Sequence, residues 1–561
     1  MTKFFGRIFS CILLVLFVSG TAVARSEVTD AIPSSASWVI VAHHIGKQSA
    51  TVRTILDRFK GLVPELGNEK IASELRRTTG EDLASAEGMI AYGIDPEGSA
   101  ALWADDFEKE PYVVIPISDQ KKFIERLSRK IKVEDDKAGL ARPKIRAGVS
   151  IYTKNGERFG IKNGYLVLEP SAGGKIGIKS FFSRGKKLGK DVNFLAVKKE
   201  IPNDRDGLMY FSVSYMRKAW KKHQKDFQEH TRKLLKTTKS PATKKMFSEE
   251  LSGAVKTQRR FDRFLQGFRG VGFWWKLKSD RLTGGALFAT TPKGQRTLAK
   301  VFPTQVSVPG FHKRMLKASM LGGWSSVNPG AFLDWIGDAP QAPWITMKDE
   351  LLRSAKEFRK EVKMDLFSDF INNLSQPVGA YILVPSIDML DTKAPVDNQF
   401  LSLMRVALVA KVNDSNKAKA LLSRFDVMAD KNGATLKHPK AQGVTITTLT
   451  EQGSGMEISW AQNKANIMMG IGSQPFSVLF RAVSDEAGRS SDLIGETRID
   501  FPAISEVISS AVSKGFGGSE GVRMRMMWPI VKQLFGRFGA LDIRGFFTKN
   551  GLKFVAGLDI H

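Results

Sequence analysis

The sequence predicts an α+β fold made of two related halves, each an antiparallel sheet with helices packed on one face. Three observations support this prediction: a pattern that recurs at one fixed offset, Asn-Gly turns between short strands, and a similar pair of strands near the end of each half. The length of 561 residues agrees, because it exceeds the ~100–200 residues of a usual domain. An internal repeat of this kind indicates a duplicated domain and so bears on the whole architecture.

The recurring pattern joins a strand, a helix that begins at an aspartate, and a second strand. The first copy reads VVIPISDQKKFIERL around Asp119 and continues 29 residues later with GVSIY from Gly148. The second copy reads VALVAKVNDSNKAKALLSRF around Asp414 and continues 29 residues later with GVTIT from Gly443. Both pairs are separated by 295 residues. Because aspartate is a preferred helix N-cap, we expect both aspartates to begin helices rather than to act as acids.

The remaining elements follow from hydrophobic periodicity and turn residues. Asn155-Gly156 and Asn163-Gly164 predict type I′ turns, and hence a meander of three antiparallel strands. In the first half we expect strands at 37–42, 100–104 and 112–117, helices at 49–62 and 69–86 with a break at 80–82, and a hairpin over 272–290. In the second half we expect a strand at 321–324, a helix after Asn328, a long helix at 347–373, a strand at 379–384 and a hairpin over 545–560.

These elements imply a division of the chain into four parts. Residues 1–24 are a signal peptide, 25–302 the first repeat, 303–317 a linker, and 318–561 the second repeat. The linker is expected where Pro303 and Pro309-Gly310 interrupt the pattern. The first repeat carries a basic helical insertion near 216–264.

The N-terminus is typical of an export signal. Lys3 and Arg7 precede an apolar stretch over 8–20, and Ala22-Val23-Ala24 fits the small-x-small cleavage pattern. The apolar stretch is short for the ~20 residues of a membrane-spanning helix. We therefore expect cleavage after Ala24 rather than retention as an anchor, and a periplasmic or secreted protein.

The cysteine content limits the chemistry of the exported chain. Cys11 is the only cysteine and lies within the predicted signal. The residues before it do not form a lipoprotein cleavage box, so we do not expect a lipoprotein. A chain that begins at Arg25 has no thiol, which excludes disulfides, cysteine nucleophiles and cysteine-ligated zinc.

The charge balance favours anionic partners. The whole chain has a net charge of +28, and loss of two basic residues with the signal leaves +26. Such a balance attracts lipid surfaces, lipopolysaccharide or cell-wall polymers. A basic surface without a specific partner is the alternative.

The strongest concentration of positive charge lies in the helical insertion. From Arg217 to Lys245, eleven lysines and arginines accompany two acidic residues. Apolar and histidine residues recur there at spacings of three and four, which predicts a narrow seam formed by Met216, Trp220, His223, Phe227, His230 and Leu234. Packing is the favoured interpretation of this seam, and contact with an anionic lipid surface is the alternative. The candidate binding residues are Lys218, Lys221, Lys222, Lys225, Arg232, Lys233 and Trp220.

Catalytic and metal-binding motifs are not apparent. His43 and His44 are adjacent on a strand and so point to opposite faces. His223 and His230 are two helical turns apart, or ~10 Å, which is too far to chelate one ion. We find no GxSxG, HExxH or phosphate-loop motif. The sequence therefore favours a non-enzymatic protein without metal or cofactor, and the alternative is a hydrolase with paired carboxylates, for which the acidic loop over 105–110 is a weak candidate.

One segment resembles known proteins. The turn Gly93-Ile94-Asp95-Pro96, the strand 100–103 and the VVIPISDQKKFIERL segment are similar to a group of uncharacterised exported bacterial proteins that share a domain of unknown function. The resemblance covers Ser37 to about Leu168, and it extends weakly into the second half, where Gln376-Pro377 stands in place of the turn. It implies export and a duplicated α+β fold, and it supplies no catalytic residues.

The combined prediction is an exported, envelope-associated binding protein for an anionic lipid, glycolipid or polymer. We expect the ligand on the basic surface around 217–245 or in a groove between the halves. Nucleic acid is not an expected partner of an exported protein. A protein-interaction scaffold is a further alternative, and a large exposed apolar patch would be its sign.

Overall fold

A computed structural model describes the chain in segments. The described residues are 27–59, 68–106, 109–126, 144–146, 149–154, 157–169, 177–183, 185–303, 306–385, 390, 399, 405–431, 434–441, 444–450, 457–463, 466–472, 489–516 and 522–561. The expected signal peptide and the Asn155-Gly156 turn lie outside them. The chain divides into two compact units: unit 1 comprises the residues up to Met216 with 269–289 and 560–561, and unit 2 comprises 217–268 and 290–559.

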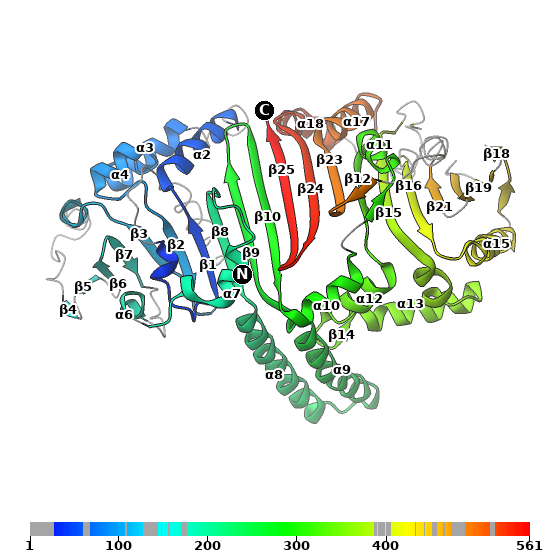
Figure 1. The fold of residues 1–561 in the computed structure, drawn as a ribbon, viewed down its shortest axis with the longest axis horizontal. Coiled ribbons are helices and arrows are strands. Elements are labelled where there is room, and N and C mark those ends of the chain that lie inside the picture. Colours follow the sequence, from blue (N-terminus) through cyan, green and yellow to red (C-terminus); the bar gives the residue numbers. More distant parts are fainter. Residues whose placement is uncertain are drawn as a thin grey trace. The chain divides into compact units, whose positions relative to one another are not determined.

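Unit 1 is built on a sheet whose strands run in the order β10, β9, β8, β1, β2, β3, β7, β6, β5, β4, and every pairing with a recorded register is antiparallel (Figure 1). The strands are β1 (Trp38–Ala42), β2 (Ala100–Ala104), β3 (Tyr112–Pro116), β4 (Lys144–Arg146), β5 (Val149–Lys154), β6 (Glu157–Lys162), β7 (Tyr165–Leu168), β8 (Gly207–Ser212), β9 (Phe268–Leu277) and β10 (Arg281–Thr290). The helices are η1 (Val28–Asp30), α2 (Ile45–Phe59), α3 (Asn68–Thr79), α4 (Ala86–Tyr92), α6 (Gly177–Phe182), η3 (Leu188–Lys190) and α7 (Val192–Lys198).

Local sequence rules account for several element boundaries in unit 1. Asn163 and Gly164 have φ values of 53° and 75°, so the predicted type I′ turn joins β6 to β7. The predicted break between helices falls at Gly80, which has a φ of 82°. Asp119 accepts a hydrogen bond from the Lys122 backbone at 2.9 Å, as expected for an N-cap.

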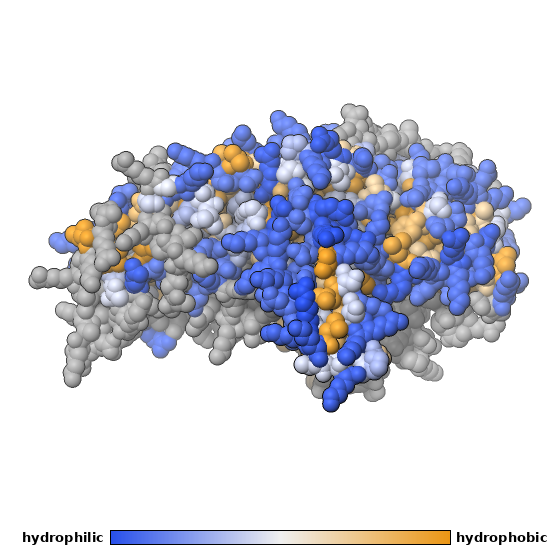
Figure 2. Space-filling model, turned by 90° about the horizontal axis from the view of Figure 1, so that it is seen from below, coloured by the Kyte–Doolittle hydropathy of each residue, from blue (hydrophilic) through white to orange (hydrophobic). Residues whose placement is uncertain are grey.

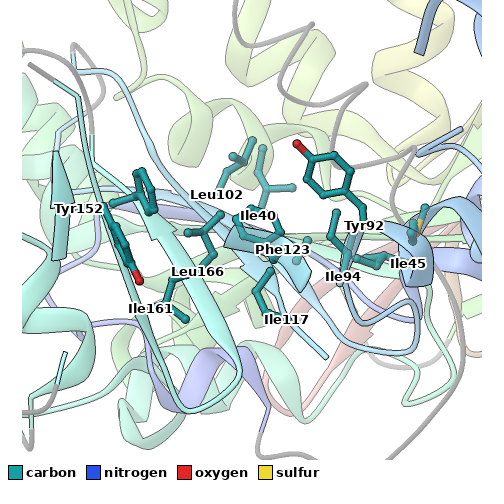
Figure 3. Close-up of a cluster of buried hydrophobic side chains, with 14 of the residues drawn as sticks. Ile40, Ile45, Tyr92, Ile94, Leu102, Ile117, Phe123, Tyr152, Ile161 and Leu166 are labelled. Carbon is teal, nitrogen blue, oxygen red and sulfur yellow. The ribbon is translucent and has the colours of Figure 1, made fainter. Parts of the chain in front are cut away.

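The core of unit 1 lies between the sheet and its helices. Figure 3 shows side chains from β1, β2 and α4, among them Ile40, Leu102 and Tyr92, gathered with Phe123 and Leu166 into one buried cluster. Tyr92 and Phe123 meet edge to face at 5.5 Å. Burial of this apolar surface is the main force that holds the helices on the sheet.

Unit 2 is also built on antiparallel strands, in the order β24, β23, β12, β15, β16, β21, β20, β19, β17. Its strands are β11 (Val306–Val308), β12 (Ser319–Ser325), β13 (Pro340–Ala342), β14 (Ile345–Thr346), β15 (Leu374–Leu383), β16 (Val406–Val412), β17 (Thr435–Lys437), β18 (Lys440–Ala441), β19 (Val444–Thr450), β20 (Glu457–Asn463), β21 (Asn466–Ile471), β22 (Arg489–Ser491), β23 (Leu493–Asp500), β24 (Phe538–Thr548) and β25 (Gly551–Ile560).

The helices of unit 2 include the basic insertion. They are α8 (Val213–Thr237, from Arg217 onward in this unit), α9 (Pro241–Leu265), α10 (Pro292–Val301), α11 (Phe311–Ala318), α12 (Pro329–Ile336), α13 (Met347–Val362), the short turns η4 (Leu366–Phe370) and η5 (Ile371–Asn373), α15 (Ser415–Lys431), α17 (Phe501–Ser513) and α18 (Val522–Phe535). Helices α8 and α9 lie side by side as a hairpin (Figure 1).

Two expectations for unit 2 differ from the structure. The helix expected over 347–373 ends at Val362, because Lys363 adopts a left-handed φ of 57° and Asp365 caps a separate turn. The segment expected to be a linker, 303–317, instead contains β11 and α11. Their apolar side chains, including Phe311 and Met315, are buried in the core of this unit. By contrast, Asp414 caps α15 as expected, accepting from the Asn416 and Lys417 backbones at 2.9 and 3.1 Å.

The molecule is therefore a mixed α+β protein with extensive antiparallel sheet, in agreement with the predicted fold class. None of the helices in the described segments is both long enough and apolar enough to cross a bilayer.

Candidate functional site

The basic helical insertion forms a hairpin of two helices that are joined by polar side chains. Ser240 caps α9 by accepting from the Thr243 backbone, and Pro241 occupies the first helical position, where it is well tolerated. Between the helices, Arg217 donates two hydrogen bonds to Asp262, at 2.9 and 3.1 Å. A bidentate pair of this kind fixes the relative orientation of the two helices as well as stabilising them.

All six candidate cations of α8 are exposed on one side of the helix. Lys218, Lys221, Lys222, Lys225, Arg232 and Lys233 are each solvent-exposed. Because an α-helix has 3.6 residues per turn, these positions fall within about a third of its circumference and extend over roughly 22 Å. Among the described residues, no carboxylate lies within ion-pair distance of Lys218, Arg232 or Lys233. The structure thus places the six predicted cations on one side of α8, here called the α8 cationic face, where the exposed Glu229 lies between Lys225 and Arg232.

Lys221 and Lys225 of this face have acidic neighbours at long range. Lys221 lies 3.6 Å from Asp262, which Arg217 already engages, and Lys225 lies 3.8 Å from Glu229 on the same helix. Exposed pairs of this kind contribute little stability, so the lysines remain accessible to a ligand.

Trp220, the aromatic candidate, lies on the other side of α8. It is half-buried, and its ring meets Phe261 of α9 edge to face at 4.9 Å. This placement agrees with the packing interpretation of the seam. Trp220 therefore holds the hairpin together beneath the cationic face.

The buried side of α8 differs in part from the predicted seam. His223 and His230 are exposed, whereas Gln224 and Thr231 are almost completely buried, with 0% and 2% of their surface accessible. Gln224 donates to the backbone oxygen of Pro343 at 3.0 Å. The buried side of α8 thus includes Gln224 and Thr231 in place of the neighbouring histidines. Burial of Gln224 is favourable because its side chain has a hydrogen-bond partner distant in the sequence.

The hairpin is docked against residues 335–349. The ring of Phe227 stacks on Trp344 at 5.6 Å and 19°. Gly253 of α9 packs against the same segment, since a Cβ there would come within 2.4 Å of the Trp344 carbonyl oxygen. The insertion, assigned by sequence order to the first half, therefore packs on residues from the second half of the chain.

A charged cluster completes this docking. Arg260 donates to the Thr346 hydroxyl at 2.8 Å and to Asp349 at 3.0 Å, and Lys256 lies 3.0 Å from the same carboxylate. Burial raises the pKa of Asp349, but hydrogen bonds from Thr346 and Lys256 and the charge of Arg260 outweigh it and hold that pKa well below its usual range. Arg260 and Lys256 are thus neutralised within the fold.

A second set of cations on α9 borders two depressions. Lys256, Arg259 and Arg263 line an open hollow of about 810 Å³ along α9. Arg263 also borders a smaller, more enclosed pocket of about 210 Å³. Arg259 and Arg263 are exposed, and among the described residues neither has an acidic partner within ion-pair distance.

The smaller pocket combines aromatic walls with charged edges. Its aromatic lining comprises Phe264, Phe268 and Trp335, and the ring centroids of Phe264 and Trp335 lie 5.4 Å apart. Arg263 and Lys293 supply its positive charges. Its two carboxylates have cationic neighbours, Asp334 with Lys348 at 2.9 Å and Asp338 with Arg260 at 3.9 Å. The pocket therefore has aromatic walls, with two cations and two carboxylates at its edge.

The surroundings of the hairpin are predominantly hydrophilic. Figure 2 shows this side of the molecule as mostly hydrophilic, with a narrow apolar strip near its centre and further apolar areas toward either end. Of three tryptophans in the first part of the second half, Trp335 and Trp344 contact the hairpin, whereas Trp324 is buried in the core of unit 2.

The paired histidines of unit 1 have partners in and directly after the turn Gly93–Gly98. His43 Nδ1 lies 3.1 Å from Ser99 Oγ, and His44 Nδ1 lies 3.8 Å from Glu97 Oε2. Burial and the charge of Arg205 lower the pKa of His43 to about 4. The two rings therefore have different partners, and the GIDPEG turn serves to seat the end of β1.

Unit 2 contains a further buried histidine. His312 is fully buried, and its Nδ1 makes a short hydrogen bond with the Tyr381 hydroxyl. Burial lowers the pKa of His312 to about 3 and raises that of Tyr381. Tyr381 belongs to the core cluster of this unit, and the His312 ring lies 4.0 Å from the ring of Phe311 in the same cluster, so the pair has a packing role.

Metal ligands do not converge in the described part of the chain, where no group of three or more His, Cys, Asp or Glu side chains is placed to hold an ion. In the acidic loop, Asp105, Asp106 and Glu110 belong to the described residues, whereas Glu108 lies outside them.

The sequence singled out the cations of α8 but did not indicate the smaller pocket. The pocket joins residues of α9, α10 and α12 with Asp338 beyond α12, and its lining residues are up to 75 positions apart in the chain. Comparison of the chain with family models, with curated proteins and with solved structures gave no match.

Proposed function

We propose that this protein is exported and binds, without catalysis, an anionic ligand of the cell envelope on its α8–α9 hairpin. The ligand bears repeated phosphate or carboxylate groups, as an anionic lipid surface, a glycolipid or an envelope polymer does. The observation that carries the proposal is the α8 cationic face, a stripe of six exposed cations on a helix whose opposite side is packed.

The charge of the hairpin supports this proposal more strongly than net charge alone. Arg217, Lys256 and Arg260 are engaged by Asp262 and Asp349, so they stabilise the fold. The α8 cationic face, by contrast, is exposed along its whole length. Clustered positive charge on a rigid helix attracts anions and speeds their association, with a strong dependence on salt.

The small pocket adds a place for part of the ligand. Arg263 and Lys293 stand at its edge, and Phe264, Phe268 and Trp335 form its walls. A ligand whose charged groups lie along the hairpin could place a ring or short apolar group here. We propose that this pocket contributes selectivity, whereas the cationic face contributes affinity.

The test is co-sedimentation of the chain from Arg25 onward with anionic and neutral vesicles, at low and at physiological salt. The test variant replaces Lys218, Lys221, Lys222 and Lys225 by glutamine. The control variant removes the same charge from four exposed lysines elsewhere in unit 2, Lys356, Lys411, Lys417 and Lys419. A parallel titration with soluble polyphosphate separates an anionic polymer from a lipid surface.

The proposal expects salt-sensitive binding to anionic vesicles or polyphosphate that the test variant loses and the control variant retains. Equal binding to neutral and anionic vesicles, or equal loss in both variants, would contradict it. A lipid surface is the ligand source if only vesicles bind, and a polymer if polyphosphate binds as well.

We also propose that the fold arose by duplication, as two related halves that are each an antiparallel sheet with helices on one face. The strand order supports this. In unit 1, β9, β8, β1, β2, β3, β7, β6 and β5 are successive neighbours, and in unit 2 β24, β23, β12, β15, β16, β21, β20 and β19 follow in the same antiparallel sequence. The helices α8 and α9 then correspond to α17 and α18, because each pair joins matching strands.

The matching of strands agrees with the 295-residue offset in the sequence, since Asp119 follows β3 and Asp414 follows the matching strand β16. A sequence profile built from each half tests it. Recovery of the second half by the first at the matched positions is the expected result, and recovery at any other register would contradict it.

A further inference from the structure

Helix α18 carries an exposed apolar strip on the side that faces away from the rest of unit 2. Val522, Met526, Ile530 and Leu534 recur at every fourth position, with 45%, 68%, 61% and 42% of their surfaces accessible. Met527 beside them is 62% accessible. Residues four apart lie on one face of a helix, so these side chains form a continuous strip roughly 18 Å long.

The opposite side of α18 is firmly attached. Trp528 is buried and donates from its indole nitrogen to the Ser509 hydroxyl of α17 at 3.0 Å. Phe535 stacks on Phe501 of α17 at 5.8 Å. Helix α17 in turn contacts β24 and β12. The apolar strip is therefore presented outward by a helix that is held in place, and it is not the loose end of an unpacked segment.

The positive charge of α18 indicates which kind of surface covers the apolar strip. Helix α18 contains Arg523, Arg525 and Lys532 and no acidic residue, and the whole chain has a net charge of +28. An apolar helical face accompanied by basic residues is the composition of helices that lie in the interface of an anionic membrane. Methionine, with its flexible thioether, also adapts to irregular apolar surroundings such as lipid chains.

We propose that α18 lies in the surface of an anionic lipid bilayer, with the strip from Val522 to Leu534 among the outer parts of the lipid chains. The α8–α9 hairpin is not needed for this contact. Figure 1 shows α17 and α18 at the end of β24 opposite the one near which α8 and α9 lie. A chain bound through α18 would hold the cationic face away from the same bilayer, where it would meet a polymer or a second membrane.

The experiment is flotation of the chain from Arg25 onward with vesicles of phosphatidylglycerol and phosphatidylcholine at physiological salt. The test variant is Met526→Ser with Ile530→Ser. The control variant is Leu352→Ser with Val427→Ser, which removes two apolar side chains of 43% and 53% exposure from other helices. Loss of two such side chains from the lipid corresponds to a loss on the order of a hundredfold in partitioning. We expect that loss in the test variant and none in the control.

A second readout locates the contact. The chain from Arg25 onward has no cysteine, so the Met526→Cys variant can carry a single environment-sensitive dye. The emission of this dye is expected to shift to the blue on vesicles, whereas a dye on the Lys419→Cys variant is expected not to shift. When Lys218, Lys221, Lys222 and Lys225 are also replaced by glutamine, the dye at position 526 should keep its blue shift. That result separates this inference from the proposed function of the hairpin.

Two results would overturn the inference. One is a test variant that floats as well as the unaltered chain, or a dye at position 526 that stays in water when the chain is on vesicles. The other is an unaltered chain that does not float but forms a dimer that Met526→Ser with Ile530→Ser dissociates, which would assign the strip to a second copy of the chain.

Discussion

The docking of the α8–α9 hairpin is predicted to depend on one carboxylate, Asp349. Arg260 of α9 donates to it at 3.0 Å, and the side chains of Arg260 and Asp349 are only 16% and 23% exposed. Replacement of Asp349 by Asn keeps the shape and an oxygen acceptor near the Thr346 backbone. It removes the negative charge that balances Arg260 and Lys256.

The expected cost follows from this burial. Loss of one partner from a fully buried ion pair costs about 3–5 kcal/mol, and an exposed pair is worth at most about 1 kcal/mol. With both groups mostly but not completely buried, we expect Asp349→Asn to destabilise hairpin docking by about 2 kcal/mol. Asp334→Asn is the matched control, because Asp334 also pairs with a lysine, at 2.9 Å, but is 76% exposed. Its cost should stay below about 1 kcal/mol.

Hydrogen exchange of α8 and α9, measured by mass spectrometry, reports this docking directly. A loss of about 2 kcal/mol raises the fraction of open hairpin on the order of thirtyfold, so exchange of its amides should accelerate by that factor. Amides of the unit 1 sheet provide the internal reference. Equal protection of the hairpin in Asp349→Asn and Asp334→Asn would refute the argument that the Arg260 cluster holds it.

Three further predictions concern the fold. Gly253→Ala should weaken docking of the hairpin even though alanine favours a helix, because the new Cβ would meet the Trp344 carbonyl oxygen. Slower hydrogen exchange of the α9 amides in this variant would contradict this close packing. Gly164→Ala should lower the free energy of unfolding by about 1 kcal/mol in urea titrations, since φ is 75° there, and an unchanged midpoint would speak against the type I′ turn. The pKa of His312 is lowered from 6.5 to about 3, so the unfolded chain binds the proton first and stability falls as the pH drops below about 6.5. Between pH 7 and pH 5 the free energy of unfolding should fall by about 2 kcal/mol more in the unaltered chain than in His312→Gln. His230→Gln, at an exposed position, should keep the full pH dependence. An identical pH profile for all three proteins would exclude His312 as its source.

The features that sequence predicted best are those that depend on local chemistry. Asp119 and Asp414 were identified as helix caps because a short carboxylate can accept from the first free backbone amides. Asn163-Gly164 was identified as a turn because both residues tolerate positive φ. Each of these signals is contained in a few consecutive residues, so no tertiary information was needed.

The features that sequence missed depend on partners far away in the chain. Gln224 is buried because the Pro343 carbonyl accepts its hydrogen bond, and nothing near position 224 indicates that partner. Helix α13 ends at Val362 because Lys363 adopts a left-handed conformation, which is rare for lysine and so is not expected from the sequence. By contrast, the spacing of Phe311, Met315 and Leu316 was a readable helical pattern within the segment taken as a linker.

The candidate site shows the same limit. The lysines of α8 were found from composition and helical spacing alone. Which of the hairpin cations are neutralised by the fold was not predictable, because Asp349 is 89 residues from Arg260 and its contact requires the tertiary fold. The exposed strip of α18 was hidden for a similar reason: VRMRMMWPIV is apolar on several sides, and only the position of α17 decides which side is buried.

The central claim is that the α8 cationic face binds an anionic ligand, and the most direct measurement is the salt dependence of that binding. Affinity for phosphatidylglycerol vesicles or polyphosphate is measured over a range of salt concentrations for the unaltered chain and for the variant with Lys218, Lys221, Lys222 and Lys225 replaced by glutamine. The account predicts weaker binding and a shallower salt dependence for the variant, because fewer charges are screened. Equal affinity and equal salt dependence in the unaltered chain and the variant would contradict this claim, and would place the ligand away from this helix.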